Sequence, residues 1–280
     1  MGSERHDAEK PIGVFDSGMG GLTVMRAIAE RLPFEQMIYL GDTARLPYGT
    51  KSQETVSRYA VQAARELKSH RVKAIVVACN TASAQALPAL TAAFSPLPVL
   101  GVVEPGARAA VAASQSNHIA VIATEGTVKG GAYERAIRSL APGAKVTQVA
   151  CPLFVSLAEE GWVEGELPRM AAERYLAAAF GPGVADKPDC LVLGCTHFPV
   201  LRQVIASYVG AGVSIVDSAA SAAAELERIL MAENLKRAGS RPPQHAYLAT
   251  DAPERFARVG GLFLGRPIRP DEVALVDISQ

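Results

Sequence analysis

The sequence has few cysteines, few aromatic residues and no excess of charge of either sign. Its 280 residues include four cysteines, 6% aromatic residues, and 28 basic against 28 acidic side chains. A small secreted scaffold held by disulfides would be richer in cysteine. None of the four cysteines forms the C-x-x-C motif found in zinc ribbons and thioredoxins. The balanced charge gives no indication of a nucleic-acid partner or a membrane-surface protein.

Long apolar runs are also missing. No segment approaches the roughly 18–20 apolar residues that span a bilayer, and residues 1–10 lack the apolar centre of a signal peptide. We therefore expect a cytoplasmic protein with reduced thiols and no membrane partner, with residues 1–10 as a flexible extension. The hydrophobic fraction of 49% is typical of a globular chain, and the length allows two domains.

Short apolar runs alternate with amphipathic helical patterns from residue 11 onward. The runs expected to form strands are Ile12–Phe15, Met37–Leu40, Ala74–Ala78, Val99–Val103, Ile119–Ala123, Val146–Val149, Leu191–Leu193 and Val213–Val216. Most show no polar alternation, which is typical of parallel strands buried on both faces. The pattern predicts an α/β fold with open parallel sheets. Thr50 and Gln53 are expected to form a capping box where the second helix begins.

Two stretches of the sequence repeat later in the chain. The strand and turn that begin at Ile12 return at Ile119 (119 − 12 = 107), and the strand ending in Cys79 returns in the strand ending in Cys195 (195 − 79 = 116). Any two strand–turn–helix units share some features, but the similar offsets favour two related domains facing each other across a cleft about a pseudo-twofold axis. We expect one domain over 11–104 plus 217–280, the other over 105–216, and the joint near 104–106.

Polar residues and glycines follow several of the predicted strands, where open α/β sheets bind ligands. These segments are Asp16-Ser17-Gly18, Pro47-Tyr48-Gly49, Cys79-Asn80-Thr81 and Cys195-Thr196-His197. Each cysteine is expected at a turn into a helix, where the helix N-terminus would lower the pKa of its thiol. The glycines at 18–21 do not complete a dinucleotide fingerprint, because Thr23 stands at its third glycine position. We interpret them as a tight turn that allows close backbone approach, with no cofactor implied.

Equivalent thiols in two facing halves suggest acid–base chemistry at one carbon. One thiolate removes a proton from one face, and the other thiol delivers a proton to the opposite face, which inverts the centre. Alternatively, Cys79 and Cys195 are buried core thiols, as free cysteines often are. Cys151 and Cys190 lack this context and are expected to be bystanders.

Five ordered motifs between Ile12 and Phe263 resemble the cofactor-independent glutamate racemases of bacterial cell-wall synthesis. They are Val14–Gly21 (VFDSGMGG), Gly41–Gly49 (GDTARLPYG), Ala78–Ala82 (ACNTA), Gly101–Gly106 (GVVEPG) and Leu193–Pro199 (LGCTHFP). The resemblance implies interconversion of L- and D-glutamate without pyridoxal phosphate, metal or nucleotide. It implies that Cys79 takes the α-proton of D-glutamate and Cys195 that of L-glutamate. It further implies that Asp16, His197 and a glutamate, Glu159 or the adjacent Glu160, assist them.

The same resemblance assigns the substrate contacts to Asp16, Ser17, Tyr48, Gly49, Asn80, Thr81, Thr196 and His197. Other interpretations stay open at this point. Asp16 could cap the first helix, and His197 could be a structural histidine. A relative acting on aspartate or a hydantoin would share the cysteines, and an amino-acid-binding module would share the cleft. The expected partner is a small-molecule substrate, and a homodimer is compatible with this class of protein.

Overall fold

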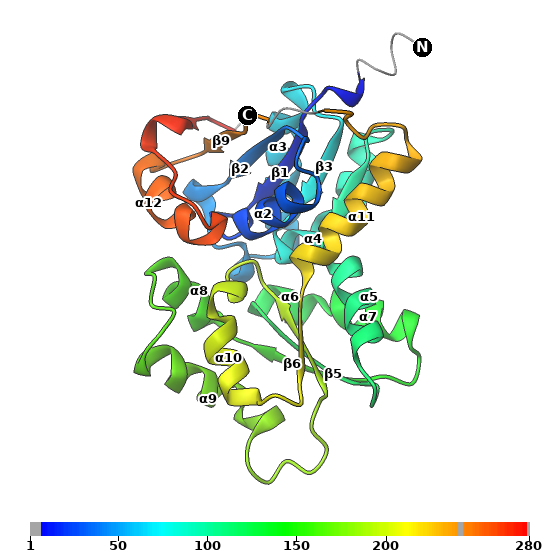
Figure 1. The fold of residues 1–280 in the computed structure, drawn as a ribbon, viewed down its shortest axis with the longest axis vertical. Helices are drawn as coiled ribbons and strands as arrows, with labels where there is room; N and C mark the ends of the chain where they lie inside the picture. Colours follow the sequence, from blue (N-terminus) through cyan, green and yellow to red (C-terminus); the bar gives the residue numbers. More distant parts are fainter. Residues whose placement is uncertain (1–6, 240–242, 279–280) are drawn as a thin grey trace.

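The computed structural model describes residues 7–239 and 243–278. They form two parallel sheets, one in each of two halves that lie one after the other along the long axis of the molecule (Figure 1). The first sheet has the order β10-β9-β2-β1-β3-β4 and the second β6-β5-β7-β8. The strands are β1 (Ile12–Asp16), β2 (Met37–Gly41), β3 (Ala74–Val77), β4 (Val99–Gly101), β5 (His118–Ala123), β6 (Lys145–Ala150), β7 (Cys190–Gly194), β8 (Ser214–Asp217), β9 (Ala246–Ala249) and β10 (Val273–Leu275). All pairings of these strands are parallel, so the predicted α/β fold with parallel sheets is confirmed.

The two sheets repeat one strand order. The sequence β2-β1-β3-β4 in the first sheet corresponds to β6-β5-β7-β8 in the second, and β9 and β10 extend only the first. In this order, the crevice that binds ligands lies beyond the carboxyl ends of the first and third strands. The third strands are β3 and β7, which lead into Cys79 and Cys195. The repeat inferred from the sequence is therefore present in the topology.

Helices cover both faces of each sheet. The first sheet packs against α3 (Gln53–Ser69) and α4 (Asn80–Phe94) on one face, and against α2 (Leu22–Arg31), α11 (Ser218–Ala232) and α12 (Pro253–Leu264) on the other. The second packs against α8 (Pro152–Glu159), α9 (Glu166–Phe180) and α10 (Arg202–Val209) on one face, and against α5 (Val103–Ala113), α6 (Glu125–Gly130) and α7 (Ala132–Leu140) on the other. Short 3-10 helices are η1 (Thr43–Arg45), η2 (Tyr48–Thr50), η3 (Phe198–Leu201) and η4 (Pro270–Glu272). Within the described residues, no helix combines the length and the apolar character needed to cross a membrane.

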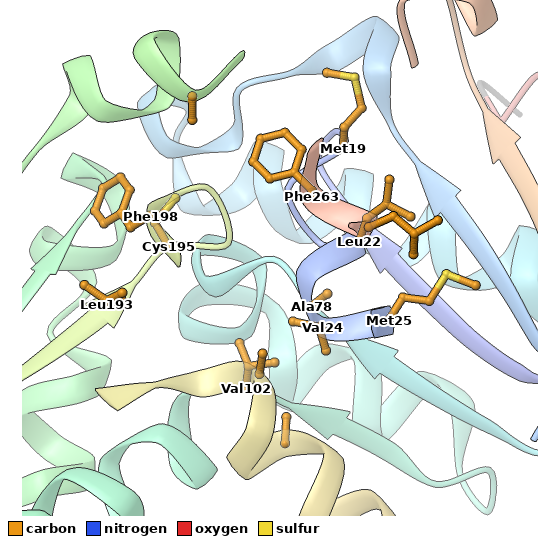
Figure 2. Close-up of a cluster of buried hydrophobic side chains, with 14 of the residues drawn as sticks. Met19, Leu22, Val24, Met25, Ala78, Val102, Leu193, Cys195, Phe198 and Phe263 are labelled. Atoms are coloured by element: carbon orange, nitrogen blue, oxygen red, sulfur yellow. The ribbon is translucent and has the colours of Figure 1, made fainter. Parts of the chain in front are cut away.

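One apolar cluster runs through both halves. Successive side chains of a strand point to opposite faces, so Ile12 and Val14 pack toward α2 while Phe15 packs toward α3. Figure 2 shows Phe263, from the first half, in the same cluster as Cys195 from the second. The two halves therefore share buried apolar surface beside the predicted site.

The chain passes between the sheets twice, over 102–117 and again after β8. The predicted domain boundaries stay a prediction, which these two passages support. The expected joint at 104–106 lies within this first passage, in the first turn of α5, where the missing N–H of Pro105 has no helical partner to lose.

The start of α3 and the chain terminus also differ from expectation. The predicted capping box at Thr50 is wrong. Ser52 caps α3 by accepting the N–H of Thr55 at 3.3 Å. Of the predicted flexible extension, residues 1–6 lie outside the described residues, while the carbonyl of Ala8 accepts a hydrogen bond from Lys73.

Candidate active site

A small cavity lies at the carboxyl ends of β3 and β7, between the two halves. Its lining is Ser17, Pro47, Tyr48, Gly49, Cys79, Asn80, Thr81, Thr124, Val155, Cys195, Thr196 and His197. The lining thus includes both cysteines and every predicted substrate contact except Asp16. The cavity measures about 20 Å³, which is room for about one water. A dicarboxylic amino acid is several times larger, so the cavity would have to widen to hold one.

Cys79 is the N-cap residue of α4, as its position after a strand predicted. Its sulfur accepts the N–H of Ala82 at 3.5 Å and its thiol donates to the hydroxyl of Ser17 at 3.7 Å. The expected lowering of the thiol pKa is wrong here. Burial and the nearby Asp16 carboxyl group outweigh the helix N-terminus and raise the pKa of Cys79 to about 12. The raised pKa favours the neutral thiol of Cys79, which can donate a proton.

Cys195 lies at the end of a line of side chains. His197 Nδ1 is 3.8 Å from Cys195 Sγ, and His197 Nε2 is 3.2 Å from Glu159 Oε1. Burial alone would lower the pKa of His197, but hydrogen bonds with Cys195 and Glu159 and the charges around it raise this pKa to about 10. The imidazole is therefore protonated at neutral pH and places a positive charge beside the sulfur. Glu160, the other carboxylate left open by the sequence, is exposed.

Asp16 lies behind the cavity, fully buried. One carboxyl oxygen accepts the N–H of Gly18 at 2.9 Å and the other accepts the hydroxyl of Thr196, from the second half, at 3.3 Å. Burial raises the pKa of Asp16, and the charge of His197 opposes that rise. Asp16 does not cap α2, whose N-cap residue is Gly21. It instead shapes the loop that follows β1 and links the two halves.

The glycine loop of residues 18–21 lies directly against the second half. A Cβ at Gly20 would lie 2.6 Å from both His197 Nδ1 and Thr196 Oγ1, and one at Gly21 would lie 2.6 Å from Asp16 Cβ. Real Cβ atoms do not approach other atoms this closely. The glycines therefore serve the close backbone approach that the sequence predicted.

Asn80 presents an unsatisfied donor at the cavity. Its Oδ1 accepts the hydroxyl of Tyr133, from α7 of the other half, at 2.7 Å, while its buried Nδ2 has no partner among the described residues. Because Tyr133 occupies the amide oxygen, the amide nitrogen remains available to a ligand. Together with the backbone N–H groups at the start of α4, it forms a binding position for a carboxylate.

Tyr48 is held by a neighbour on its own side of the cavity, and Thr81 by a neighbour across it. The hydroxyl of Tyr48 donates to the buried Asp42, which also accepts from Arg45. The hydroxyl of Thr81 lies 2.9 Å from that of Thr124 in the second half. Both polar side chains are therefore fixed before a ligand arrives.

Several residues at the site were missed in the sequence. Thr124 could have been found from the repeat, since it corresponds to Ser17 (17 + 107 = 124). Asp42 pairs with the nearby Tyr48, whereas Tyr133 and Arg255, which contact Asn80 and Glu159, act through pairings between distant segments that no local pattern indicates. In the part of the chain that the structure describes, no group of three His, Cys, Asp or Glu residues could hold a metal ion.

Comparison with known proteins agrees with this geometry. A family model described as Asp/Glu/Hydantoin racemase matches residues 12–226. A glutamate racemase from Geobacter metallireducens is 50% identical over 256 residues, covering 91% of this chain and 93% of that protein.

Solved structures are similar over nearly the whole chain. Glutamate racemase from Francisella tularensis, in complex with D-glutamate, has a TM-score of 0.89 at 35% identity and covers 97% of this chain and 99% of that one. Glutamate racemase from Thermus thermophilus, in complex with beta-chloro-D-alanine, has a TM-score of 0.84 at 41% identity and covers 96% and 98%.

Proposed function

The chain belongs to the Asp/Glu/hydantoin racemase family, and we propose that it interconverts L- and D-glutamate and so supplies D-glutamate for peptidoglycan synthesis. The observation that carries this proposal is the cavity in which one thiol comes from each half, Cys79 after β3 and Cys195 after β7. Two thiols brought from opposing halves can reach opposite faces of one α-carbon. The proposed reaction uses no pyridoxal phosphate, metal or nucleotide.

In the direction from L to D, the Cys195 thiolate takes the α-proton. The C–H bond breaks, its electron pair stays on carbon, and an S–H bond forms at Cys195. The Cys79 thiol then gives its proton to the opposite face of the carbon. In the reverse direction Cys79 is the base and Cys195 the acid. His197, held by Glu159, places a positive charge beside the Cys195 sulfur, and the Asp16 carboxyl group assists proton transfer at the nearby Cys79.

Neutral donors hold the substrate in this proposal. The cavity lining contains no Lys or Arg, so the substrate carboxylates bind to Asn80 Nδ2, to hydroxyl groups and to backbone N–H groups. An α-proton next to an ionised carboxylate is very weakly acidic, and its removal needs preorganised donors in a site that excludes water. The cavity has room for about one water, which supports a site that excludes bulk water.

The test is to follow L-glutamate by circular dichroism with purified protein and no added cofactor. We expect the optical signal to decay to zero while the amount of glutamate stays constant, and dialysis against a chelator to leave the rate unchanged. Cys79→Ala and Cys195→Ala should each abolish the decay while the protein remains folded. Near-normal turnover in either variant would remove the two-base mechanism.

Aspartate or a hydantoin as the substrate is the second candidate, because the matching family model includes racemases of all three. The same circular dichroism assay with each compound decides between them. A binding module without catalytic activity would leave the optical signal of every compound unchanged. The relatives at 42–50% identity named glutamate racemase favour glutamate.

We also propose a cytoplasmic homodimer. All four cysteines are unpaired, which supports a reducing compartment.

Trp162, Leu167 and Met170 are each more than half exposed around the start of α9, which supports a second copy of the chain covering them. Light scattering on the purified protein should give twice the mass of one chain, and a monomer at micromolar concentration would contradict the dimer.

A further inference from the structure

Arg255 joins the two halves beside the cavity. It lies on α12, which packs on the first sheet, and its Nη2 is 3.2 Å from Glu159 Oε2 on α8 of the second half. Figure 1 shows α12 directly above α8, across the boundary between the halves. The carboxylate is 10% exposed and the guanidinium side chain 45% exposed, so the pair closes the edge of the site toward solvent.

Glu159 divides its two oxygens between two cations. Oε1 pairs with His197 Nε2 and Oε2 pairs with Arg255. Burial would raise the pKa of Glu159, but His197 and Arg255 together lower it below its ordinary value. The result is a continuous line of side chains, Arg255–Glu159–His197–Cys195, that reaches from solvent to the sulfur.

We propose that Arg255 is a positioning residue for proton transfer at Cys195, holding Glu159 against His197 when the two halves are closed. The inference rests on the proposed racemase function and extends it to a residue outside the cavity. Arg255 does not line the cavity, and its ion pair is with Glu159, so we infer that it acts through Glu159. Because it comes from the opposite half, the line of side chains is complete only in the closed arrangement.

The groups around this line of side chains determine the effect of removing Arg255. His197 faces Cys195, Asp16 and Glu159, with the ring of Phe263 edge-on at 5.2 Å. Without Arg255, Glu159 keeps only His197 as a cationic partner and loses the contact that fixes its second oxygen. Its pKa should rise, so the acid limb of the kcat–pH profile should move to higher pH. A misplaced His197 slows transfer at Cys195, and we expect a loss in kcat of about tenfold.

The test compares Arg255→Gln and Arg255→Lys with Arg258→Gln. Arg258 is a matched control because it is an exposed arginine on the same helix with no ion pair among the described residues. We expect Arg255→Gln to show the shifted acid limb and the lower kcat, Arg255→Lys to recover part of both, and Arg258→Gln to match the wild type. An unshifted profile in Arg255→Gln would overturn the proposal.

Isotope effects separate positioning from a general loosening of the fold. On the proposed roles, α-deuterated L-glutamate loses its deuterium to Cys195 and α-deuterated D-glutamate loses it to Cys79. If Arg255→Gln slows only the Cys195 step, the isotope effect on kcat/KM should increase when L-glutamate is the substrate and decrease when D-glutamate is the substrate. Equal changes on both sides would mean that Arg255 supports the structure alone, and would overturn the proposal.

A readout without turnover keeps the two proposals distinguishable. If the wild-type protein did not racemise glutamate, the proposed function would fail, but the ion pair could still be measured through the melting temperature. A carboxylate with a lowered folded-state pKa stabilises the protein above its unfolded pKa and loses that contribution as the pH falls. Arg255→Gln should therefore lose less stability than Arg258→Gln between neutral pH and about pH 3. Parallel curves would overturn the role of Arg255 toward Glu159.

Discussion

Replacing Gly20 by alanine is the sharpest test of how closely the two halves must meet. The added Cβ would lie 2.6 Å from His197 Nδ1, while ordinary van der Waals contact begins near 3.4 Å, so the ring must retreat by about 0.8 Å (3.4 − 2.6). That retreat disturbs a ring placed 3.8 Å from Cys195 Sγ and 3.2 Å from Glu159 Oε1. A misplacement of about 1 Å costs on the order of 100-fold in rate, or about 2.7 kcal/mol of transition-state stabilisation.

We therefore expect Gly20→Ala to lower kcat/KM for glutamate about 100-fold. Overpacking of this kind costs about 1–3 kcal/mol of folding stability at most, because the halves can separate to relieve it. Gly18→Ala is the matched control in the same loop, since its Cβ would lie 3.8 Å from Leu46 and would meet only ordinary contact. The assay is racemisation followed by circular dichroism, together with a melting curve for each variant. Activity within threefold of the wild type in Gly20→Ala would refute the inferred close approach.

Two further variants test the hydrogen bonds and the charge at the site. Tyr133→Phe removes the hydroxyl that holds Asn80 Oδ1, so the amide can rotate, and KM should rise about tenfold with little change in kcat, measured by initial rates. An unchanged KM would show that Asn80 is fixed by other contacts. The pKa of His197 is raised to about 10 from an ordinary value of 6.5. The stability it contributes is therefore complete below pH 6.5 and is lost as the pH rises toward 10, with a slope of up to about 1.4 kcal/mol per pH unit. Melting temperatures over this window should fall more steeply for the wild type than for His197→Gln, and parallel curves would contradict the raised pKa.

Much of the fold could be predicted because strand and turn patterns are local. The eight predicted strands all exist, and β9 and β10, which carry the returning C-terminal segment, were not separately predicted. The repeat could be detected because the two halves retain similar residues in their strand–turn–helix segments. The helix start at Ser52 was missed, since Thr50 and Gln53 have the spacing of a capping box and Ser52 and Thr55 do not.

The surroundings of the site were harder to predict because they depend on burial and on distant pairs. Cys79 lies at a helix N-terminus as predicted, but its pKa is raised rather than lowered. The burial that raises it depends on how the two halves pack together. Arg255 and Glu159 are separated by 96 positions. Nothing near either residue in the sequence indicates the other.

The repeat also explains how two similar halves provide one acid and one base. Asp16 corresponds to Ala123 in the other half (16 + 107 = 123), and His197 corresponds to Thr81 (81 + 116 = 197). Each half therefore has one ionisable group for which the other half has a residue that does not ionise. The surroundings of Cys79 raise the pKa of its thiol, while the Cys195 sulfur has the His197 imidazolium beside it. On the proposed roles, the neutral Cys79 thiol is the acid for L-glutamate, and it must lose its proton before it can act as the base for D-glutamate.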